Sequence, residues 1–210
     1  SDSVTVAALH VSSWFDMAQE ALEIAGIFRD NALNDRARNG QYAIISPTVH
    51  CASESASGET MVGALPVGDA RLHYWETYLA WFDRWLRGNE HAIDDLPHFQ
   101  YYVIGRNEWR SSDTWPVRGM REVPYYLRSA GGANSAAGSG RLSLAPPARV
   151  RPDTFTYNPG DPVPSRGGSI CCTGNPEDQP GSYDNRDIEA RGDVLVYTGD
   201  VLHEGLELTG

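Results

Sequence analysis

The sequence lacks the features of a membrane protein and of a nucleic-acid-binding protein. It contains no apolar run near the roughly 20 residues that a bilayer-spanning helix needs. The amino-terminal residues Ser1–Val4 show no basic segment followed by an apolar core, so no signal peptide is visible. Positive charge is scarce, because 17 Lys and Arg against 28 Asp and Glu give a net charge of −11, which repels phosphate backbones. We therefore expect no membrane partner and no nucleic-acid partner.

Cysteine is scarce as well. The three cysteines are Cys51, Cys171 and Cys172, and their spacing matches no metal-ligand pattern. The adjacent Cys171 and Cys172 are interpreted as two free thiols rather than as a strained vicinal ring. Cys51 follows His50 directly, but neighbouring loop residues rarely point at one another, so we do not interpret them as a Cys/His pair. The sequence predicts no metal and no cofactor, and the cellular compartment stays open.

A nucleophile elbow of the form G-x-S-x-G is also missing. The nearest imitation runs from Gly167 to Cys171 and has Cys in place of the last Gly. An elbow needs a strand before it and a helix after it, so that the serine stands at the top of a sharp turn. The flanking sequence predicts neither element, and Ser169 is therefore rejected as a nucleophile.

The residues that indicate chemistry lie in the first 50 positions. Residues 4–11 form an apolar run rich in β-branched side chains, which is typical of a buried strand, and Asp16 follows it. A second apolar strand at 42–45 leads to His50, after a helical stripe formed by Met17, Ala21, Ile24 and Phe28. Because reactive groups collect at the carboxyl ends of strands in open α/β sheets, we expect Asp16 and His50 at one edge, within hydrogen-bonding reach.

Asp16 and His50 each have a simpler interpretation. Asp16 is placed to cap a helix that begins at Met17, with Gln19 completing a capping box, and one carboxylate can serve both roles. His50 alone would be an ordinary loop histidine, but among six histidines it is the one that follows an apolar strand, a proline and an upstream acid. We interpret the pair as catalytic: Asp16 orients the imidazole, and His50 is the general base for a serine.

Several segments resemble serine hydrolases of the family that includes cocaine esterase, α-amino acid ester hydrolase and X-Pro dipeptidyl-peptidase. SSWFD is similar to the family's G-W-Y-D segment, and SPTVH is similar to its G-P-W-x-H segment. Five later stretches resemble the family in the family's order: WFDRWLRG, NEWRSSDTWP, YYLRSAGGANSAAGSGRLS, DTFTYNPGDPVPSRGG and DNRDIEARGDVLVYTGDVLHEGLELTG. Ser13 stands where the family usually has Gly, and Thr48 stands near its usual Trp, changes that would alter the acyl pocket.

The resemblance implies a serine hydrolase that cleaves an ester or amide bond of a small molecule through an acyl-serine intermediate. Esterase, acylase and dipeptidyl-peptidase chemistry all occur in the family, so the acyl specificity stays open. The nucleophile serine and the oxyanion donors are expected in an N-terminal segment that precedes this chain. The segment alone is therefore expected to be inactive.

A second helix is predicted from Ala70 to Arg87, with Asp69 as its N-cap and Gly88 after its end. Its apolar positions follow the helical period, and so we expect them to pack in the core over the sheet. These positions are Leu72, Trp75, Leu79, Phe82 and Leu86.

From residue 99 onward, short apolar or alternating runs separated by Gly, Pro, Asn and Asp indicate an antiparallel sandwich. Residues 1–92 are predicted to be the C-terminal portion of an α/β-hydrolase catalytic domain, with its last strands and helices only. Residues 93–210 are predicted to be a partial domain, which the resemblance identifies as an all-β jelly-roll sandwich. Residues 159–185 are expected to form an extended arm over this sandwich. We expect the chain to be a fragment of a larger protein at both ends.

Two other functions are compatible with the sequence. In a non-catalytic binding module, the sandwich would bind carbohydrate or a protein, and Asp16 would be only a cap. Exposed aromatic residues would then form a ligand platform, with Trp109, Trp115, Tyr125 and Tyr183 as candidates. In a split enzyme, a separate chain would supply the serine half. Homo-oligomerisation stays open in every case.

Overall fold

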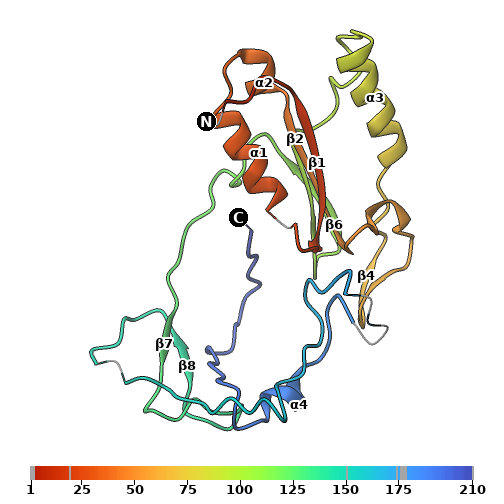
Figure 1. The fold of residues 1–210 in the computed structure, drawn as a ribbon. Helices are drawn as coiled ribbons and strands as arrows, with labels where there is room; N and C mark the ends of the chain where they lie inside the picture. Colours follow the sequence, from red (N-terminus) through yellow and green to blue (C-terminus); the bar gives the residue numbers. More distant parts are fainter. Residues whose placement is uncertain (1–2, 19, 150, 174, 176–178, 210) are drawn as a thin grey trace. The chain divides into compact units, whose positions relative to one another are not determined.

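The computed structural model describes residues 3–18, 20–149, 151–173, 175 and 179–209 (Figure 1). Its contacts divide the chain into two compact units. The first contains Ser1–Arg118 and Gly167–Tyr183, and the second contains Gly119–Arg166 and Asp184–Thr209. This division differs from the boundary predicted between residues 92 and 93, because the strands that follow that boundary pair with the first sheet. The assignment of 93–210 to a separate domain stays a prediction.

The first unit is built on a four-stranded sheet with the order β1-β2-β5-β6. The strands β1 (Ala8–Phe15), β2 (Gln41–Val49) and β5 (Phe99–Val103) are parallel, and β6 (Glu108–Ser112) is antiparallel to β5. All residues of β2 up to Thr48 are buried, as expected for a central strand covered on both faces. The two consecutive parallel strands expected from the sequence are present, and β1 spans Ala8–Phe15 instead of the predicted residues 4–11, so that it ends directly before Asp16.

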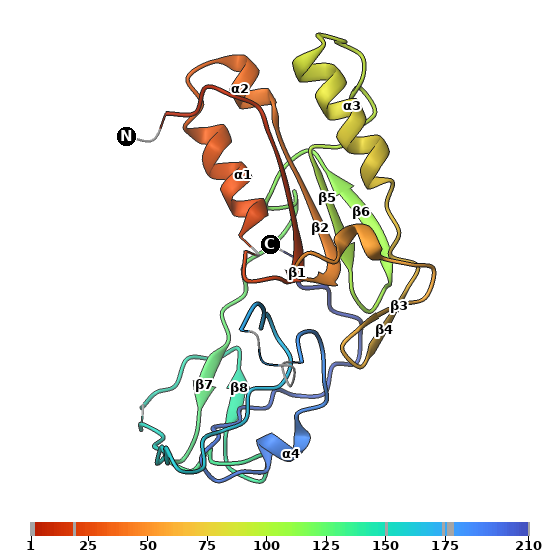
Figure 2. The same cartoon turned by 45° about the vertical axis from the view of Figure 1, so that its right-hand side comes forward.

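Two helices, α1 (Ala21–Asp30) and α3 (Tyr74–Leu86), pack on opposite faces of this sheet (Figures 1 and 2). Alternate residues of a strand point to opposite faces, and β2 contacts both helices in this way. Ile45 packs with α1, whereas Tyr42 packs against Trp81 of α3, with ring centroids 5.3 Å apart. The other elements of this unit are α2 (Asp35–Asn39), the 3-10 turn η1 (Ser53–Ser55), β3 (Thr60–Val62) and β4 (Leu65–Gly68).

Four of the five apolar residues predicted to pack in the core are exposed, contrary to expectation, and the fifth, Leu72, is partly buried but precedes the helix, which begins at Tyr74 rather than at Ala70. The buried residues of α3 are Tyr74 and Trp81. Asp69 does not cap the helix; its side chain accepts a hydrogen bond from the backbone N–H of Arg71 instead. Helical spacing identifies an amphipathic helix but does not identify the partner that covers its apolar face. The exposed fractions are 67% for Trp75, 72% for Leu79, 55% for Phe82 and 77% for Leu86.

No helix in the described part of the chain combines the length and the apolar character needed to cross a membrane. The amphipathic α3 has 13 residues and carries Glu76, Asp83 and Arg84 among its apolar side chains. The apolar residues of α3 therefore form a surface stripe on a short helix.

The second unit contains a two-stranded antiparallel sheet of β7 (Tyr126–Arg128) and β8 (Arg141–Ser143), and a short helix α4 (Arg186–Glu189). The apolar run at residues 193–199, one of the short runs expected to form strands, contributes only isolated bridges, between Asn134 and Leu195 and between Arg141 and Thr198. Among its described residues, the buried apolar side chain is Ala133. The jelly-roll sandwich therefore stays a prediction.

Candidate active site

The strands β1 and β2 end level with each other, and each is followed by a residue capable of acid–base chemistry. Phe15 is the register partner of Val49 at the end of the parallel pair. The next residues along the two strands are Asp16 and His50. The register shifts between Ser13 and Phe15, and such irregularities re-aim the side chains beside them. The topology thus brings the acid and the imidazole to one edge of the sheet.

The two side chains are in contact. Nδ1 of His50 lies 2.9 Å from Oδ1 of Asp16, and their side chains are 37% and 9% exposed. The same Oδ1 accepts the N–H of Ala18 at 2.9 Å. The carboxylate therefore holds the histidine and closes the turn after β1. It is not the N-cap of α1, which begins at Ala21, and the proposed capping-box partner Gln19 lies outside the described residues.

Electrostatics favour an ionised carboxylate at this position. Burial is the largest single influence and raises the pKa of Asp16, but the N–H of Ala18, the hydrogen bond and charge of His50, and the N–H of Met17 together lower it by more. The net pKa of Asp16 lies below its ordinary value. A buried carboxylate of this kind favours the imidazole tautomer with the proton on Nδ1, which leaves Nε2 free to accept a proton.

Four hydroxyl groups form a buried cluster at the same ends of β1 and β2. The oxygen of Ser46 lies 3.0 Å from that of Ser13, 2.6 Å from that of Thr48 and 2.9 Å from that of Ser53. The hydroxyl of Tyr74 is buried close to Ser46 and Ser53 without a well-formed hydrogen bond. Ser13 and Thr48, which depart from the family pattern, are thus neighbours, with oxygens 3.0 Å apart. Sequence reasoning did not identify this cluster, because serines in ordinary positions carry no signal.

Of the extended arm predicted over residues 159–185, the central part 167–183 belongs to the first unit and packs on the hairpin of β3 and β4, whereas residues 159–166 and 184–185 belong to the second unit. The N–H of Ser182 donates to the carbonyl of Val62 at 3.1 Å, and the N–H of Ala64 donates to the carbonyl of Ser182 at 2.8 Å. The approach requires glycine at Gly63, where a Cβ would lie 2.6 Å from the Ser182 carbonyl oxygen and φ is +63°. The arm is therefore held at one end by close backbone contact.

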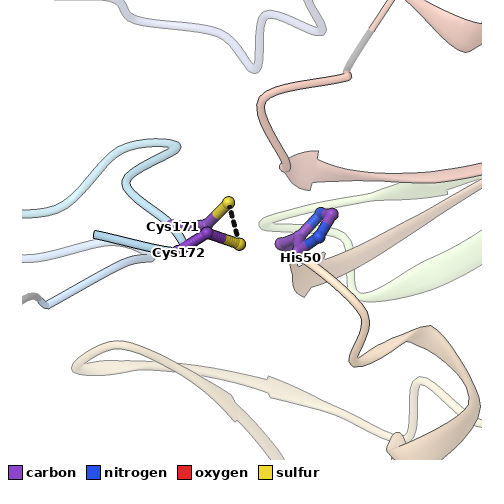
Figure 3. Close-up of side chains that lie close together, drawn as sticks. All are labelled: His50, Cys171 and Cys172. Carbon is purple, nitrogen blue, oxygen red and sulfur yellow. Dashed lines mark hydrogen bonds between the residues drawn. The ribbon is translucent and has the colours of Figure 1, made fainter. Parts of the chain in front are cut away.

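This arm places Cys171 and Cys172 beside His50 (Figure 3). One ring nitrogen of His50 and the two sulfurs all lie within 4.8 Å of one another, and the sulfurs are 2.8 Å apart. Both cysteines are free thiols, as predicted. The hydrogen bond with Cys172, followed by burial, raises the pKa of Cys171 to about 11. No local pattern predicts this grouping, because the arm brings together positions that are far apart in the chain.

The rejected nucleophile elbow has no supporting structure. The residues from Gly167 to Cys171 are irregular backbone apart from one bridge between Gly168 and Gly181. No helix follows Ser169 in the described part of the arm. The backbone therefore does not form the strand, sharp turn and helix that expose a nucleophilic serine.

The tryptophans considered for a ligand platform take part in packing. Trp115 packs against Tyr101 and Trp109 packs against Tyr102, each with ring centroids 5.4 Å apart. Both are partly buried against core clusters of the first unit. These two side chains therefore support the sheet rather than forming an exposed aromatic surface.

Comparisons with known proteins add three findings. A family model described as the X-Pro dipeptidyl-peptidase C-terminal non-catalytic domain matches residues 91–210. The chain is 32% identical over 207 residues to cocaine esterase of Rhodococcus sp. (strain MB1 Bresler), an alignment that covers 97% of this chain and 34% of that protein. It is also similar to the crystal structure of an aminopeptidase from the marine sediment archaeon Thaumarchaeota archaeon, with a TM-score of 0.65 and 20% identity over 92% of this chain and 30% of that one.

The two relatives are much longer than this chain, which spans about a third of the length of each. Asp16 and His50 precede the range that matches the non-catalytic domain. The likeness to the aminopeptidase concerns the fold alone. The match to the family model and the identity to cocaine esterase agree with each other. The chain belongs to the cocaine esterase and X-Pro dipeptidyl-peptidase family, and corresponds to its C-terminal part.

Proposed function

We propose that this chain is the C-terminal part of a serine hydrolase that cleaves ester or amide bonds through an acyl-serine intermediate. In this proposal, Asp16 and His50 are the acid and general base of the triad, carried by the last strands of an α/β-hydrolase domain, and a jelly-roll domain follows. The observation that carries the proposal is the 2.9 Å contact between these two side chains at the level ends of adjacent parallel strands.

Each group has a defined role in the proposed reaction. Nε2 of His50 takes the serine proton as the serine oxygen attacks the carbonyl carbon of the substrate. Asp16 holds Nδ1–H and stabilises the imidazolium that forms. The imidazolium then protonates the leaving group, and a water molecule activated by the same nitrogen releases the acyl group.

The nucleophile is proposed to come from outside this chain, and two surfaces of the first unit support this. β1 is an edge strand of the sheet, so its outer backbone groups can pair with a further strand. The apolar stripe of α3 is exposed over most of its length. We propose that the serine-bearing part of the hydrolase extends the sheet beyond β1 and covers this stripe. Because this chain aligns with 34% of the length of cocaine esterase, the rest of a protein of that length would hold enough residues for such a part.

A serine-directed phosphonate probe tests the proposal on the full-length protein. The probe should label the wild type, and His50→Ala should abolish the labelling. His91→Ala is a matched control, because Nδ1 of His91 lies 2.8 Å from Oδ2 of Asp94 in an exposed His–Asp pair. Labelling that is lost in His50→Ala and kept in His91→Ala supports the proposal. Equal labelling of His50→Ala and wild type would remove His50 from the mechanism.

A further inference from the structure

The thiols of Cys171 and Cys172 have no role in the proposed hydrolysis, yet they stand against its histidine (Figure 3). A ring nitrogen of His50 and both sulfurs lie within 4.8 Å of one another. Because Nδ1 of His50 is engaged by Asp16, Nε2 is the ring nitrogen that remains available to a ligand. The three side chains therefore offer one nitrogen donor and two sulfur donors to a common point.

We propose that His50, Cys171 and Cys172 bind a thiophilic divalent cation, and that Zn²⁺ is the ion that fits this donor set. Imidazole nitrogen and thiolate sulfur are the ligands that Zn²⁺ prefers, whereas Mg²⁺ and Ca²⁺ prefer oxygen. Each thiol that binds the ion releases its proton. Three protein ligands leave a fourth tetrahedral position for water.

The separations are close to those of a tetrahedral site. Zn–S bonds of about 2.3 Å and Zn–N bonds of about 2.0 Å place the ligand atoms roughly 3.5 to 3.8 Å apart. The three ligand atoms now lie within 4.8 Å of one another, so the nitrogen and the sulfurs need to approach by only about 1 Å. The two sulfurs are 2.8 Å apart and need to separate, which rotation of their side chains allows. Cys172 is exposed and the side chain of His50 is 37% exposed, so an ion can enter from solvent.

The pair of Asp16 and His50 supplies the outer support that such sites use. A histidine that binds zinc usually donates its other ring N–H to a carboxylate, which fixes the tautomer and the ring orientation. Nδ1 of His50 lies 2.9 Å from Oδ1 of Asp16, which matches this arrangement. The same contact that prepares Nε2 for a serine therefore also prepares it for a metal ion.

A regulatory consequence follows for the full-length enzyme, and this consequence rests on the proposed function. An ion on Nε2 occupies the nitrogen that must accept the serine proton, so binding of Zn²⁺ would suppress hydrolysis until a chelator removes the ion. Ion binding itself needs neither the nucleophilic serine nor any turnover, so it is measured on this chain alone.

Co²⁺ titration of the reduced 210-residue chain tests the site directly, with a thiol-free phosphine as reductant. We expect a sulfur-to-cobalt charge-transfer band that saturates at one equivalent and is displaced by Zn²⁺. Cys171→Ser and Cys172→Ser should each weaken or abolish the band, and Asp16→Asn should lower the affinity roughly 10- to 100-fold. Cys51→Ser is the matched control and should leave the band unchanged, because Cys51 is exposed and outside the donor group.

A measurement on the wild type avoids any effect of substitution on folding. Zn²⁺ should protect Cys171 and Cys172 from alkylation by iodoacetamide, with loss of both modified peptides in mass spectrometry, while Cys51 in the same sample is alkylated as before. Absence of the cobalt band, or equal alkylation of all three cysteines with and without Zn²⁺, would overturn the site. Retention of the serine-probe labelling in that case would leave the hydrolase proposal standing.

Discussion

Phe15 of β1 and Val49 of β2 are register partners at the ends of two parallel strands. The chain leaves both strands at the same level, so the residues that follow, Asp16 and His50, emerge side by side. Their contact therefore results from the register of the sheet and does not depend on a long flexible loop. This relationship is the structural basis of the proposed acid–base pair.

Asp16→Asn in the full-length protein should lower kcat for ester hydrolysis by about four orders of magnitude, because the amide no longer fixes the imidazole tautomer or stabilises the imidazolium. The corresponding change in the exposed pair, Asp94→Asn, is the control and should leave kcat unchanged. Steady-state kinetics on both variants makes the comparison. A loss below tenfold in Asp16→Asn would argue against the proposed role.

Ser46→Ala should lower the free energy of unfolding of this chain by about 1–3 kcal/mol, because the buried hydroxyls of Ser13, Thr48 and Ser53 each lose a partner. Chemical denaturation measures the change. Ser55→Ala removes an exposed hydroxyl that bonds to the carbonyl of Ala52 and should change the free energy by less than about 0.5 kcal/mol. Equal effects of the two substitutions would show that the cluster is not a cooperative unit.

Leu79→Glu in the isolated chain should change the free energy of unfolding by less than about 0.5 kcal/mol, because Leu79 is 72% exposed. Trp81→Ala on the same helix should cost about 3–5 kcal/mol, because Trp81 packs on Tyr42. In the full-length protein, Leu79→Glu should become clearly destabilising, since the proposed serine-bearing part covers this face. If Leu79→Glu is as mild there as in the isolated chain, the apolar stripe of α3 is not covered.

Acid should weaken the second unit through Asp153. Its carboxylate accepts hydrogen bonds from Ser129 at 2.6 Å, Tyr197 at 2.7 Å and the N–H of Ala133 at 3.0 Å. These hydrogen bonds, of which the one from Ser129 has the largest effect, lower the pKa of Asp153 below its ordinary value of 3.8. Because the pKa of this carboxyl is lower in the folded than in the unfolded protein, the ionised carboxylate stabilises the folded state at pH values above the unfolded-state pKa. This stabilisation is lost as the pH falls through the folded-state pKa.

Unfolding measured over a pH series checks this prediction with Asp153→Asn. The difference in stability between wild type and variant should be largest near neutral pH and should shrink below about pH 4. Asp200→Asn, at an exposed position, is the control for replacing Asp by Asn on the surface. If the difference in stability between wild type and Asp153→Asn does not change with pH, these hydrogen bonds do not stabilise the ionised form of the carboxylate.

The sequence alone predicts the part of the site that depends on local pattern. Apolar runs identify β1 and β2, and the strand-then-loop context selects Asp16 and His50 from the other acids and histidines. Parallel pairing then brings the two together, because consecutive strands of an α/β unit share an edge.

The remainder depends on contacts that no local pattern encodes. The approach of Cys171 and Cys172 to His50 follows from the packing of the arm on Gly63, a contact between distant segments. The exposure of α3 depends on what covers it, which helical spacing does not specify. Residues 193–199 have strand-like composition, but a strand forms only where a neighbour pairs with it over several residues.

The most direct test of the central claim is NMR of the ring nitrogens of His50 in this chain. We predict a slowly exchanging, downfield Nδ1–H resonance for His50 that disappears in Asp16→Ala and persists in Asp94→Ala. A wild-type spectrum in which the ring protons of His50 exchange as freely as those of the exposed His203 would contradict the account.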